Sequence, residues 1–384
     1  MLLVTMPNSK FKFLTHLFLS LLLGAILTGC ASTKSRIVKF EETSFDKIPG
    51  WEDDNHSWAL DAFKNSCKKI LAAKADNSIS KLTKIGGSVS DWQPPCIEAS
   101  LMPSCSDDEA QAFFERWFTP YKTTDDENNP HGTLTGYYQI ELQGSRKPGG
   151  KYKYPVYKKP PNLADIKGSD AINQAAINGG ALSGKGLEIA WVDNRARLYF
   201  MHIQGSGVVK LNDGSEMVLG FDGHNGYKFK GIRDALNERN LKLHSANAMM
   251  DWLHKNPKDC RAIIDQDPSF VFFRKQEAAA AVGGQGVPLK PERSIAVDCG
   301  LYPYGAPVWV ESKLPQNELY QGKEYKRLFI AQDTGGAIRG AVRGDVFFGR
   351  GMLAEKVAGG FKVPTKFYIL LPKTVKVPAS YTAG

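Results

Sequence analysis

Residues 331–349 read AQDTGGAIRGAVRGDVFFG, a glycine-rich connection between two apolar segments. Asp333 and Asp345 lie at its two edges, 12 positions apart. If the strands on either side of the connection are neighbours, both carboxylates face the same cleft. A carboxyl group held among the apolar residues 346–348, with a second carboxylate nearby, gains proton affinity through desolvation and like-charge proximity. Such a group is suited to general acid catalysis near neutral pH.

The same two aspartates also have a simpler structural interpretation. An aspartate often closes a tight turn by hydrogen bonding to its own backbone, and glycine-rich connections contain such turns. The spacing of Asp333 and Asp345 is compatible with turn formation as well as with catalysis, so it does not separate the two.

Short apolar segments separated by glycine turns extend outward from this stretch. Segments of this kind predict closed β-barrels rather than a doubly wound sheet. Residues 212–214, Asn-Asp-Gly, predict a hairpin connection. The expected strands are 133–142, 187–192, 196–204, 207–211, 269–274, 294–297, 307–311, 328–332, 345–348 and 366–371.

Helices are expected mainly ahead of the first strands. Apolar residues recur at helical spacing over 58–71, and Ser106 with Glu109 forms a capping box for a second helix. Glycines and prolines between positions 86 and 103 indicate a loop between these two helices. Further short helices are expected at 170–178, at 231–240 and after the N-cap Ser245.

The N-terminus has the pattern of a lipoprotein signal peptide. Lys10 and Lys12 precede an apolar run over 13–27, which is short for a membrane-spanning helix. Residues 27–30, Leu-Thr-Gly-Cys, resemble a lipobox, with small residues at the cleavage site and a thiol that can receive lipid at Cys30. An uncleaved membrane anchor with an incidental cysteine is the alternative.

These features predict a signal peptide over 1–29 and a lipid-modified Cys30, followed by a polar, irregular tether over 30–55. Ala31 is not the aspartate that would favour retention at the inner membrane. We therefore expect anchoring in the outer membrane, on the periplasmic face.

Composition limits the other functional classes. The 384 residues carry a formal charge of +9, but no block of lysine and arginine and no zinc-finger spacing indicates nucleic-acid binding. The seven histidines form no HxxxH pattern, and phosphate-cradling and dinucleotide-binding motifs are missing. We expect no metal and no cofactor. Ser206 lies in Gln-Gly-Ser-Gly, which is not the GxSxG motif of a nucleophilic serine.

The cysteines do not determine their own pairing. With Cys30 modified, an odd number remains for pairing within the chain. Export to an oxidising compartment favours one bridge among Cys67, Cys96 and Cys105, and buried free thiols are an equally good interpretation. Cys260 and Cys299 complete the set.

Eight segments between positions 132 and 371 together resemble the family of membrane-bound lytic murein transglycosylase A. They occur in the order that this family shows and on a sequence with a lipoprotein signal. The segments are LTGYY (134–138), LEIAWV (187–192), HIQGSG (202–207), GHNGY (223–227), DPSFVFF (267–273), RSIAVD (293–298), YGAPVW (304–309) and the stretch 333–349.

The resemblance implies a fold that is mainly β with peripheral helices. A double-psi β-barrel would be formed by residues 56–137 and 275–384. A smaller β-barrel over 138–274 would be inserted into it, and a groove between the two barrels would hold a glycan strand.

The resemblance also implies site residues and an activity. Asp345 corresponds to the catalytic acid of the family and Asp333 to an assisting aspartate. Substrate contacts are implied for Thr135, Gly136 and Tyr138 on one wall of the groove and for Gln204 and Ser206 on the other. The implied reaction cleaves the β-1,4 bond between N-acetylmuramic acid and N-acetylglucosamine in peptidoglycan and leaves 1,6-anhydromuramyl ends.

Two alternatives to this activity remain at the level of sequence. One is a non-catalytic envelope lipoprotein that binds peptidoglycan, and the other is a glycoside hydrolase on the same scaffold. Asp298 is expected to cap the strand before it, and Tyr137, Tyr138 and Trp191 are candidates for stacking on sugar rings.

Overall fold

A computed structural model describes residues 36–162, 172–277, 280–317 and 319–383 of the chain. Residues 36–384 cluster into one compact unit. The predicted signal peptide and the predicted lipidation site at Cys30 lie outside the described residues. Within the described residues, no helix is both long and apolar enough to span a membrane.

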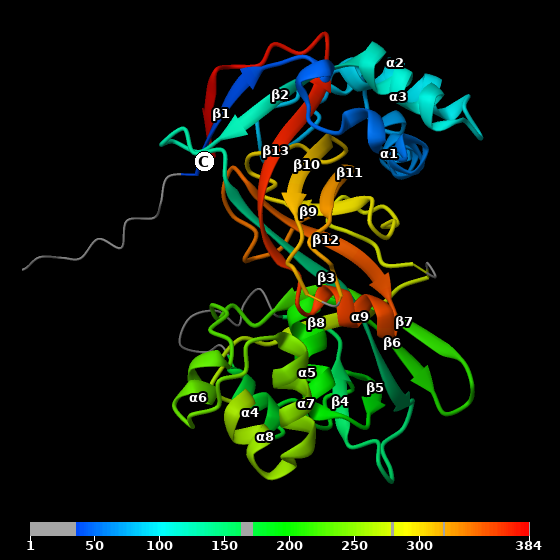
Figure 1. Cartoon of the computed structure of the whole chain (residues 1–384). Coiled ribbons are helices and arrows are strands. Elements are labelled where there is room, and N and C mark those ends of the chain that lie inside the picture. The colour runs from blue at the N-terminus through cyan, green and yellow to red at the C-terminus, as the bar shows by residue number, and fades with distance from the viewer. Residues whose placement is uncertain (1–35, 163–171, 278–279, 318, 384) are drawn as a thin grey trace, which may run out of the picture. The chain divides into compact units, whose positions relative to one another are not determined.

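The described residues form a mainly β structure with helices around it, as expected from the sequence (Figure 1). The strands are β1 (Ile37–Glu42), β2 (Phe118–Thr124), β3 (Gly132–Ser145), β4 (Tyr154–Tyr157), β5 (Glu188–Val192), β6 (Ser206–Leu211), β7 (Glu216–His224), β8 (Val271–Lys275), β9 (Ser294–Val297), β10 (Pro307–Lys313), β11 (Glu324–Asp333), β12 (Arg343–Arg350), β13 (Lys362–Pro372) and β14 (Ser380–Thr382). The helices are α1 (His56–Leu71), α2 (Val89–Ser100), α3 (Asp107–Trp117), α4 (Gln174–Asn178), α5 (Arg195–Gln204), α6 (Arg233–Asn237), α7 (Ala246–Lys255), α8 (Pro257–Ile264) and α9 (Met352–Ala358), with 3₁₀ turns η1 (Phe45–Lys47) and η2 (Trp51–Asp53).

Six strands close into a ring. Going around it, β3 pairs with β12, then β9, β11, β10 and β13 follow, and β13 pairs again with β3. The β3–β12 and β9–β11 pairs are parallel, and the other four are antiparallel. The ring leaves none of these six strands with an unpaired edge along its whole length, which is how barrels avoid exposed edges.

The interior of this barrel is tightly packed. Leu134, Ile295, Val346 and Phe367 belong to one buried cluster, which continues into helices α1 to α3. Gly344 faces the same interior, because a Cβ atom there would lie 2.7 Å from both Ile295 Cδ1 and Phe367 Cζ. Since side chains alternate along a strand, the odd-numbered residues of β12 project from the outer face of the barrel.

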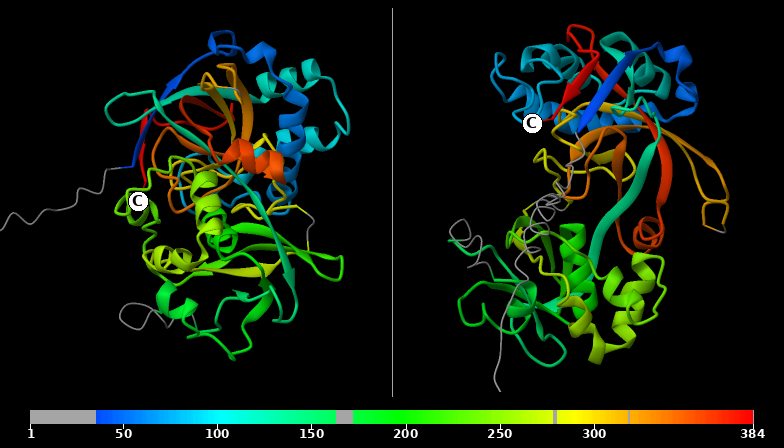
Figure 2. Two further views of the ribbon diagram at one scale, coloured as in Figure 1. Left: turned by 60° about the horizontal axis from the view of Figure 1, so that its bottom comes forward. Right: turned by 90° about the vertical axis from the view of Figure 1, so that its left-hand side faces the viewer.

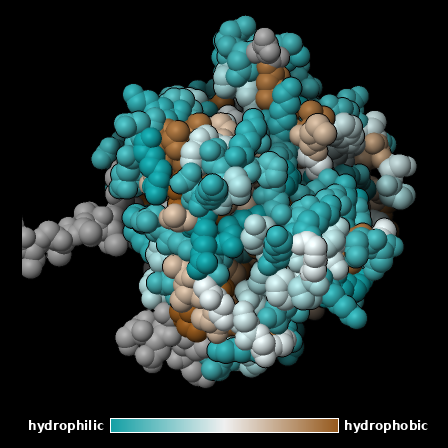
Figure 3. Space-filling view, turned by 90° about the horizontal axis from the view of Figure 1, so that it is seen from below, coloured by the Kyte–Doolittle hydropathy of each residue, from teal (hydrophilic) through white to brown (hydrophobic). Residues whose placement is uncertain are grey.

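A second sheet shares β3 with the barrel. Its strand order is β4, β5, β3, β6, β7 and β8, and β6 pairs with β3 from Ile140 onward. Helices α5, α7 and α8 pack on this sheet and bury Phe200, Leu253 and Ile263 with it. Figures 1 and 2 show β3 running from the barrel elements into this second group. The end of the molecule with this group is mostly hydrophilic, with small separate hydrophobic patches (Figure 3).

The segment before α1 differs from the sequence prediction. Residues 37–55 are not an irregular tether, because β1 pairs with both β2 and β14. Trp51 is only 2% exposed, and its indole nitrogen donates a hydrogen bond to Glu115. Half-buried and buried residues alternate only over the first four of the six positions of β1, and Glu41 and Glu42 end the strand with two exposed charges, so the pattern is too short to identify in the sequence.

Helix α2 was missed for a local reason. Pro94 and Pro95 lie inside it, and proline inside a helix removes a backbone donor. A capping box formed by Ser88 and Asp91 begins the helix all the same. A disulfide between Cys67 and Cys96 joins α1 to α2, and Cys105, Cys260 and Cys299 are free.

Several local predictions are confirmed. The Ser106–Glu109 capping box begins α3, and Ser245 caps α7 through Ala248 N–H. Residues 212–214 connect the antiparallel strands β6 and β7. The predicted helices at 170–178 and 231–240 are shorter in the structure, as α4 and α6, and residues 163–171 lie outside the described ranges.

Candidate active site

Asp345 lies on β12, beside Thr135 of β3. The two residues are direct partners in the parallel ladder, and Thr135 Oγ1 donates a hydrogen bond of 2.5 Å to Asp345 Oδ1. Burial raises the pKa of Asp345 from its ordinary value of 3.8 to about 6. The hydrogen bond from Thr135 and the charge of Arg343 oppose this rise in the pKa, and burial outweighs both.

Asp333 ends β11 in a network of three donors. Tyr137 donates its hydroxyl to Asp333 Oδ2 at 2.6 Å, and the backbone N–H groups of Gly284 and Thr334 each donate to Oδ1 at 2.8 Å. Burial raises the pKa of Asp333 despite these three bonds, which favour the ionised carboxylate. Asp333 is therefore a fixed carboxylate whose proton affinity is above normal.

The two aspartates flank a single residue of β9. Ala296 is the ladder partner of Asp333 on one side and of Asp345 on the other. The sequence argument for a shared cleft assumed that the strands on either side of the connection are neighbours. They are not, because β9 runs between β11 and β12. Two strand spacings separate their backbones by about 10 Å. The charge of Asp333 still contributes to the raised pKa of Asp345.

Apolar side chains surround the two carboxylates on the outer face of the barrel. They form a small buried cluster of their own, and its Tyr137 and Phe347 rings lie 5.3 Å apart between centroids. This surface limits hydration of the carboxylates, which is the cause of both raised pKa values. The cluster consists of Tyr137, Ala281, Leu289, Ala296, Ile338 and Phe347.

The other residues predicted on β3 have different surroundings. A Cβ atom at Gly136 would lie 2.5 Å from Phe348 Cε2, so glycine permits the ring to approach the strand. The side chain of Tyr138 is 2% exposed and belongs to the core of the second sheet. Its backbone N–H donates to Gln204 Oε1 at 3.0 Å, so Tyr138 meets Gln204 through its main chain.

Gln204 and Ser206 lie on either side of a helix end. The sequence predicted a strand over 196–204, which is wrong, because these residues form α5 and Gln204 is its last residue. Asn194 caps the helix by accepting from Arg197 N–H, and Gly205 ends it with a φ of 72°. A run of bulky residues resembling a strand concealed these helix signals.

Ser206 then begins β6, opposite Gly220 of β7, and it is half-buried. A hydrogen bond to the Tyr138 backbone thus connects Gln204 to β3, and Ser206 lies two residues further along the chain. Trp191, a stacking candidate, is half-buried on β5, whereas Tyr137 is mostly buried and bonded to Asp333.

Two features of the site were not found from sequence. Tyr137 was considered for stacking on sugars, although its position two residues beyond Thr135 places both on one strand face. No role is predicted for Arg343 from the sequence. Its position two residues before Asp345 was the available signal, because residues i and i+2 of a strand share a face.

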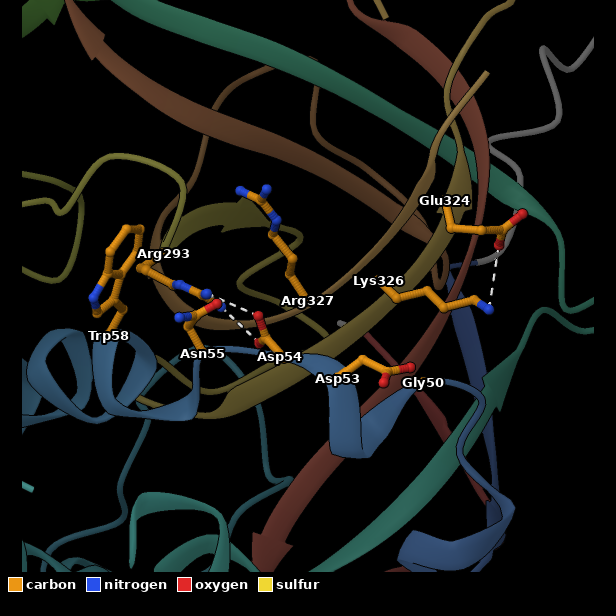
Figure 4. A pocket seen from close by; sticks show the side chains of 9 residues that line it. All are labelled: Gly50, Asp53, Asp54, Asn55, Trp58, Arg293, Glu324, Lys326 and Arg327. Atoms are coloured by element: carbon orange, nitrogen blue, oxygen red, sulfur yellow. Dashed lines mark hydrogen bonds and ion pairs between the residues drawn. The ribbon is translucent and has the colours of Figure 1, made fainter. Parts of the chain in front are cut away.

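A pocket of about 330 Å³ lies elsewhere on the barrel, near the start of β9. Its charged groups are largely paired: Arg293 forms two hydrogen bonds with Asp54, and Lys326 pairs with Glu324 at 3.2 Å (Figure 4). Neither aspartate of the candidate site lines it. Its lining residues are Gly50, Asp53, Asp54, Asn55, Trp58, Arg293, Glu324, Lys326 and Arg327.

Comparisons with known proteins agree with this architecture. A family model of the MltA specific insert domain matches residues 133–274, and a model of the 3D domain matches residues 293–371. The membrane-bound lytic murein transglycosylase A of Vibrio cholerae is 33% identical over 235 residues, which are 60% of this chain. The match spans less than two thirds of that curated relative, 62% of its length.

Solved structures match over more of the chain. A lytic transglycosylase, LtgG, of Burkholderia pseudomallei is 32% identical with a TM-score of 0.61, and the match covers 88% of this chain and 96% of that one. A membrane-bound lytic murein transglycosylase from Agrobacterium tumefaciens is 29% identical with a TM-score of 0.75, over 87% and 98% of the two chains. The chain therefore belongs to the membrane-bound lytic murein transglycosylase A family.

Proposed function

We propose that the protein is a peptidoglycan lytic transglycosylase with Asp345 as its catalytic acid. The observation that supports this most strongly is a half-buried carboxyl group with a pKa of about 6. Such a group is half protonated at a pH equal to its pKa and keeps roughly a tenth of its protons one pH unit higher, so it can donate a proton to a leaving oxygen. An ordinary aspartate with a pKa near 3.8 would be almost fully ionised under the same conditions.

In the proposed reaction Asp345 acts twice. Its proton goes to the glycosidic oxygen as the bond to muramyl C1 breaks, so N-acetylglucosamine leaves with a free 4-hydroxyl. The resulting carboxylate of Asp345 then takes the proton from the muramyl C6 hydroxyl while that oxygen bonds to C1. The products are a 1,6-anhydromuramyl end and a protonated Asp345, ready for the next cycle.

Asp333 has a supporting role in this proposal. A hydrolase of the usual kind needs a second carboxylate to activate water or to form a glycosyl ester. Here the nucleophile is a hydroxyl of the substrate, so the second carboxylate need only influence charge. Three donors fix Asp333, which suits it to raising the pKa of Asp345 and to stabilising positive charge at C1.

The architecture suggests where the glycan binds. We propose that the six-stranded ring is a double-psi β-barrel, that the second sheet belongs to an inserted barrel, and that the groove lies between them. Thr135, Gly136, Gln204 and Ser206 would contact the glycan directly. Tyr138 would contribute through its backbone, because its side chain is buried.

We further propose that lipid on Cys30 anchors the protein in the outer membrane on the periplasmic face. The proposal rests on the lipobox at 27–30 and on the apolar run before it. Metabolic labelling with a radioactive fatty acid tests it, because Cys30→Ser should lose the label that the unmodified sequence acquires.

Digestion of purified peptidoglycan sacculi tests the activity. Mass spectrometry of the soluble fragments should find 1,6-anhydromuramyl ends with the unmodified protein and no fragments with Asp345→Asn. Reducing muramyl ends would instead identify a hydrolase. Binding to sacculi without any release of fragments would identify a non-catalytic peptidoglycan-binding lipoprotein.

A further inference from the structure

Arg343 is a half-buried cation beside the proposed acid. It lies on β12 two residues before Asp345, so both side chains project from the same face of the strand. Within the part of the chain that the structure describes, its guanidinium donates hydrogen bonds only to backbone carbonyls, to Gly344 O and, at 3.5 Å, to Thr133 O. Among the described residues, no carboxylate oxygen lies within 4.0 Å of its nitrogens.

Such an environment is unfavourable for a positive charge. Burial lowers the pKa of Arg343, and the carboxylate of Asp345 only partly offsets this effect. Other arginines on the same molecule are paired closely, as Arg197 is with Glu355 at 2.7 Å. A guanidinium with several unused N–H donors is well suited to a planar carboxylate. The missing partner is therefore expected to come with the ligand.

We propose that Arg343 binds the lactyl carboxylate of the muramyl residue that is being cleaved, and that this contact favours glycan strands without peptides. The inference rests on the proposed function, since it names a feature of the same substrate. Arg343 would be a specificity-determining residue, whereas Asp345 performs the chemistry.

The chemistry of the substrate supports this assignment. The two sugars of peptidoglycan share the N-acetyl group, and only the muramyl sugar carries a lactyl ether, which ends in a carboxylate when no peptide is attached. The lactyl group and C1 belong to one sugar ring. Arg343 and Asp345 are separated by about 7 Å along β12, a distance that one ring with its substituent can span.

Electrostatics at the site make a cation necessary for this contact. The charge of Asp333, and that of Asp345 whenever it is ionised, repels an incoming carboxylate, and Arg343 is a cation on the same face of β12 as Asp345. When a peptide is attached, the lactyl carboxylate becomes an amide carbonyl. Arg343 can still donate a hydrogen bond to that carbonyl, but a hydrogen bond to a neutral acceptor is roughly half as strong.

A matched pair of substrates tests the proposal. Glycan strands freed of peptide are prepared, and one half of the sample has its lactyl carboxylates converted to methylamides. The two substrates then differ at this group alone, and the methylamide resembles the amide bond to an attached peptide. The value of kcat/KM is measured for each with the unmodified protein, Arg343→Gln, Arg343→Lys and the control Arg116→Gln, which removes an exposed arginine paired with Glu98.

The unmodified protein should prefer the carboxylate form by about tenfold, the size of effect expected from one charge-assisted hydrogen bond. Arg343→Gln should reduce this preference to less than twofold, Arg343→Lys should keep part of it, and Arg116→Gln should leave it unchanged. The ratio for two substrates is insensitive to the pKa of Asp345, because that pKa affects both rates equally. A purely structural role for Arg343 would lower both rates and leave the ratio intact.

Two results would overturn the proposal: equal rates on both substrates with the unmodified protein, or an undiminished preference in Arg343→Gln. Either result leaves the proposed activity standing, since anhydromuramyl products would still form. If the unmodified protein releases no such products from either substrate, the proposed function itself fails.

Discussion

Tyr137 donates its hydroxyl to Asp333 at 2.6 Å, joining β3 to the end of β11 across 196 positions of the sequence. This bond holds one carboxylate of the pair in place and opposes the rise in its pKa caused by burial. The charge of Asp333 is one of the causes of the raised pKa of Asp345. A substitution at Tyr137 or Asp333 is thus expected to alter the pKa of Asp345 through electrostatics.

The first prediction concerns the pH profile. The proposed mechanism requires protonated Asp345, so the rate should fall as the pH rises above about 6. Asp333→Asn removes a negative charge that raises the pKa of Asp345, so the falling limb should move to lower pH while partial activity remains. Tyr137→Phe should move the falling limb in the same direction. Loss of the hydrogen bond from Tyr137 favours neutral Asp333, and neutral Asp333 no longer raises the pKa of Asp345. A limb that stays in place or moves upward in Asp333→Asn would contradict the coupling.

The second prediction concerns the acid itself. Asp345→Asn cannot donate the proton, and general acid catalysis commonly contributes about 10²–10⁴-fold to a rate. We expect a loss of at least this size in the release of anhydromuramyl fragments, with binding to sacculi retained. Asp213→Asn, in the exposed β6–β7 turn, is the control and should cleave normally. Near-normal cleavage by Asp345→Asn would exclude Asp345 as the acid.

The third prediction concerns stability. The folded-state pKa of Asp345 lies above its ordinary value of 3.8, so the folded state binds more protons than the unfolded state between pH 3.8 and about 6. Ionisation of Asp345 therefore lowers the free energy of unfolding as the pH rises through about 6, and the protein is more stable below that pH. Asp345→Asn should increase the free energy of unfolding at pH 7.5 by on the order of 2 kcal/mol, with little change at pH 4. Chemical denaturation at the two pH values measures this, and an equal effect at both would contradict it.

The fourth prediction concerns the close approach of Phe348 to β3. Gly136→Ala places a Cβ atom 2.5 Å from the Phe348 ring, so the ring or the strand must move. We expect destabilisation by about 1–3 kcal/mol and reduced activity, because Thr135 is adjacent in β3. Gly336→Ala is the matched control, since nothing lies within 4 Å of a Cβ atom there. Similar melting temperatures for both variants would show that the ring accommodates the methyl group easily.

The fifth prediction concerns the disulfide. The Cys67–Cys96 bond closes a loop with a sequence separation of 29, and bonds of this kind commonly stabilise proteins by about 2–4 kcal/mol. Replacing both cysteines by serine should lower the free energy of unfolding by this amount. Cys105→Ser should not, because Cys105 is free. If a reducing agent fails to destabilise the unmodified protein, the bond is not present in solution.

Local sequence patterns were sufficient for much of the barrel. The strands β9, β10, β12 and β13 were expected within a few residues, because each is a short apolar run between glycine turns. The pairing was not predictable in the same way. Insertion of β9 between β11 and β12 is a long-range arrangement, and neither the spacing nor the composition of residues 331–349 encodes it.

The errors have identifiable physical causes. Residues 195–204 contain bulky aromatic and aliphatic side chains that suit a strand, but capping by Asn194 and packing on the second sheet make them a helix. Pro94 and Pro95 predict a loop, but the Ser88–Asp91 capping box begins a helix there and both prolines lie inside it. At the site, the sequence indicated Asp333 and Asp345 as candidates. The hydrogen bonds that Thr135 and Tyr137 donate to them depend on β3 lying beside β12, which is a long-range pairing.

The 14-residue strand β3 has a mechanical consequence. Thr135 and Tyr138 are three residues apart on it, one in the barrel ladder and the other at the entry to the second sheet. A flexible loop at this crossing would act as a free hinge, but β3 is continuous backbone held by ladders on both sides. Any widening between the two sheets must therefore twist β3 itself, so a glycan in the proposed groove would be held between two sheets that a continuous strand joins elastically.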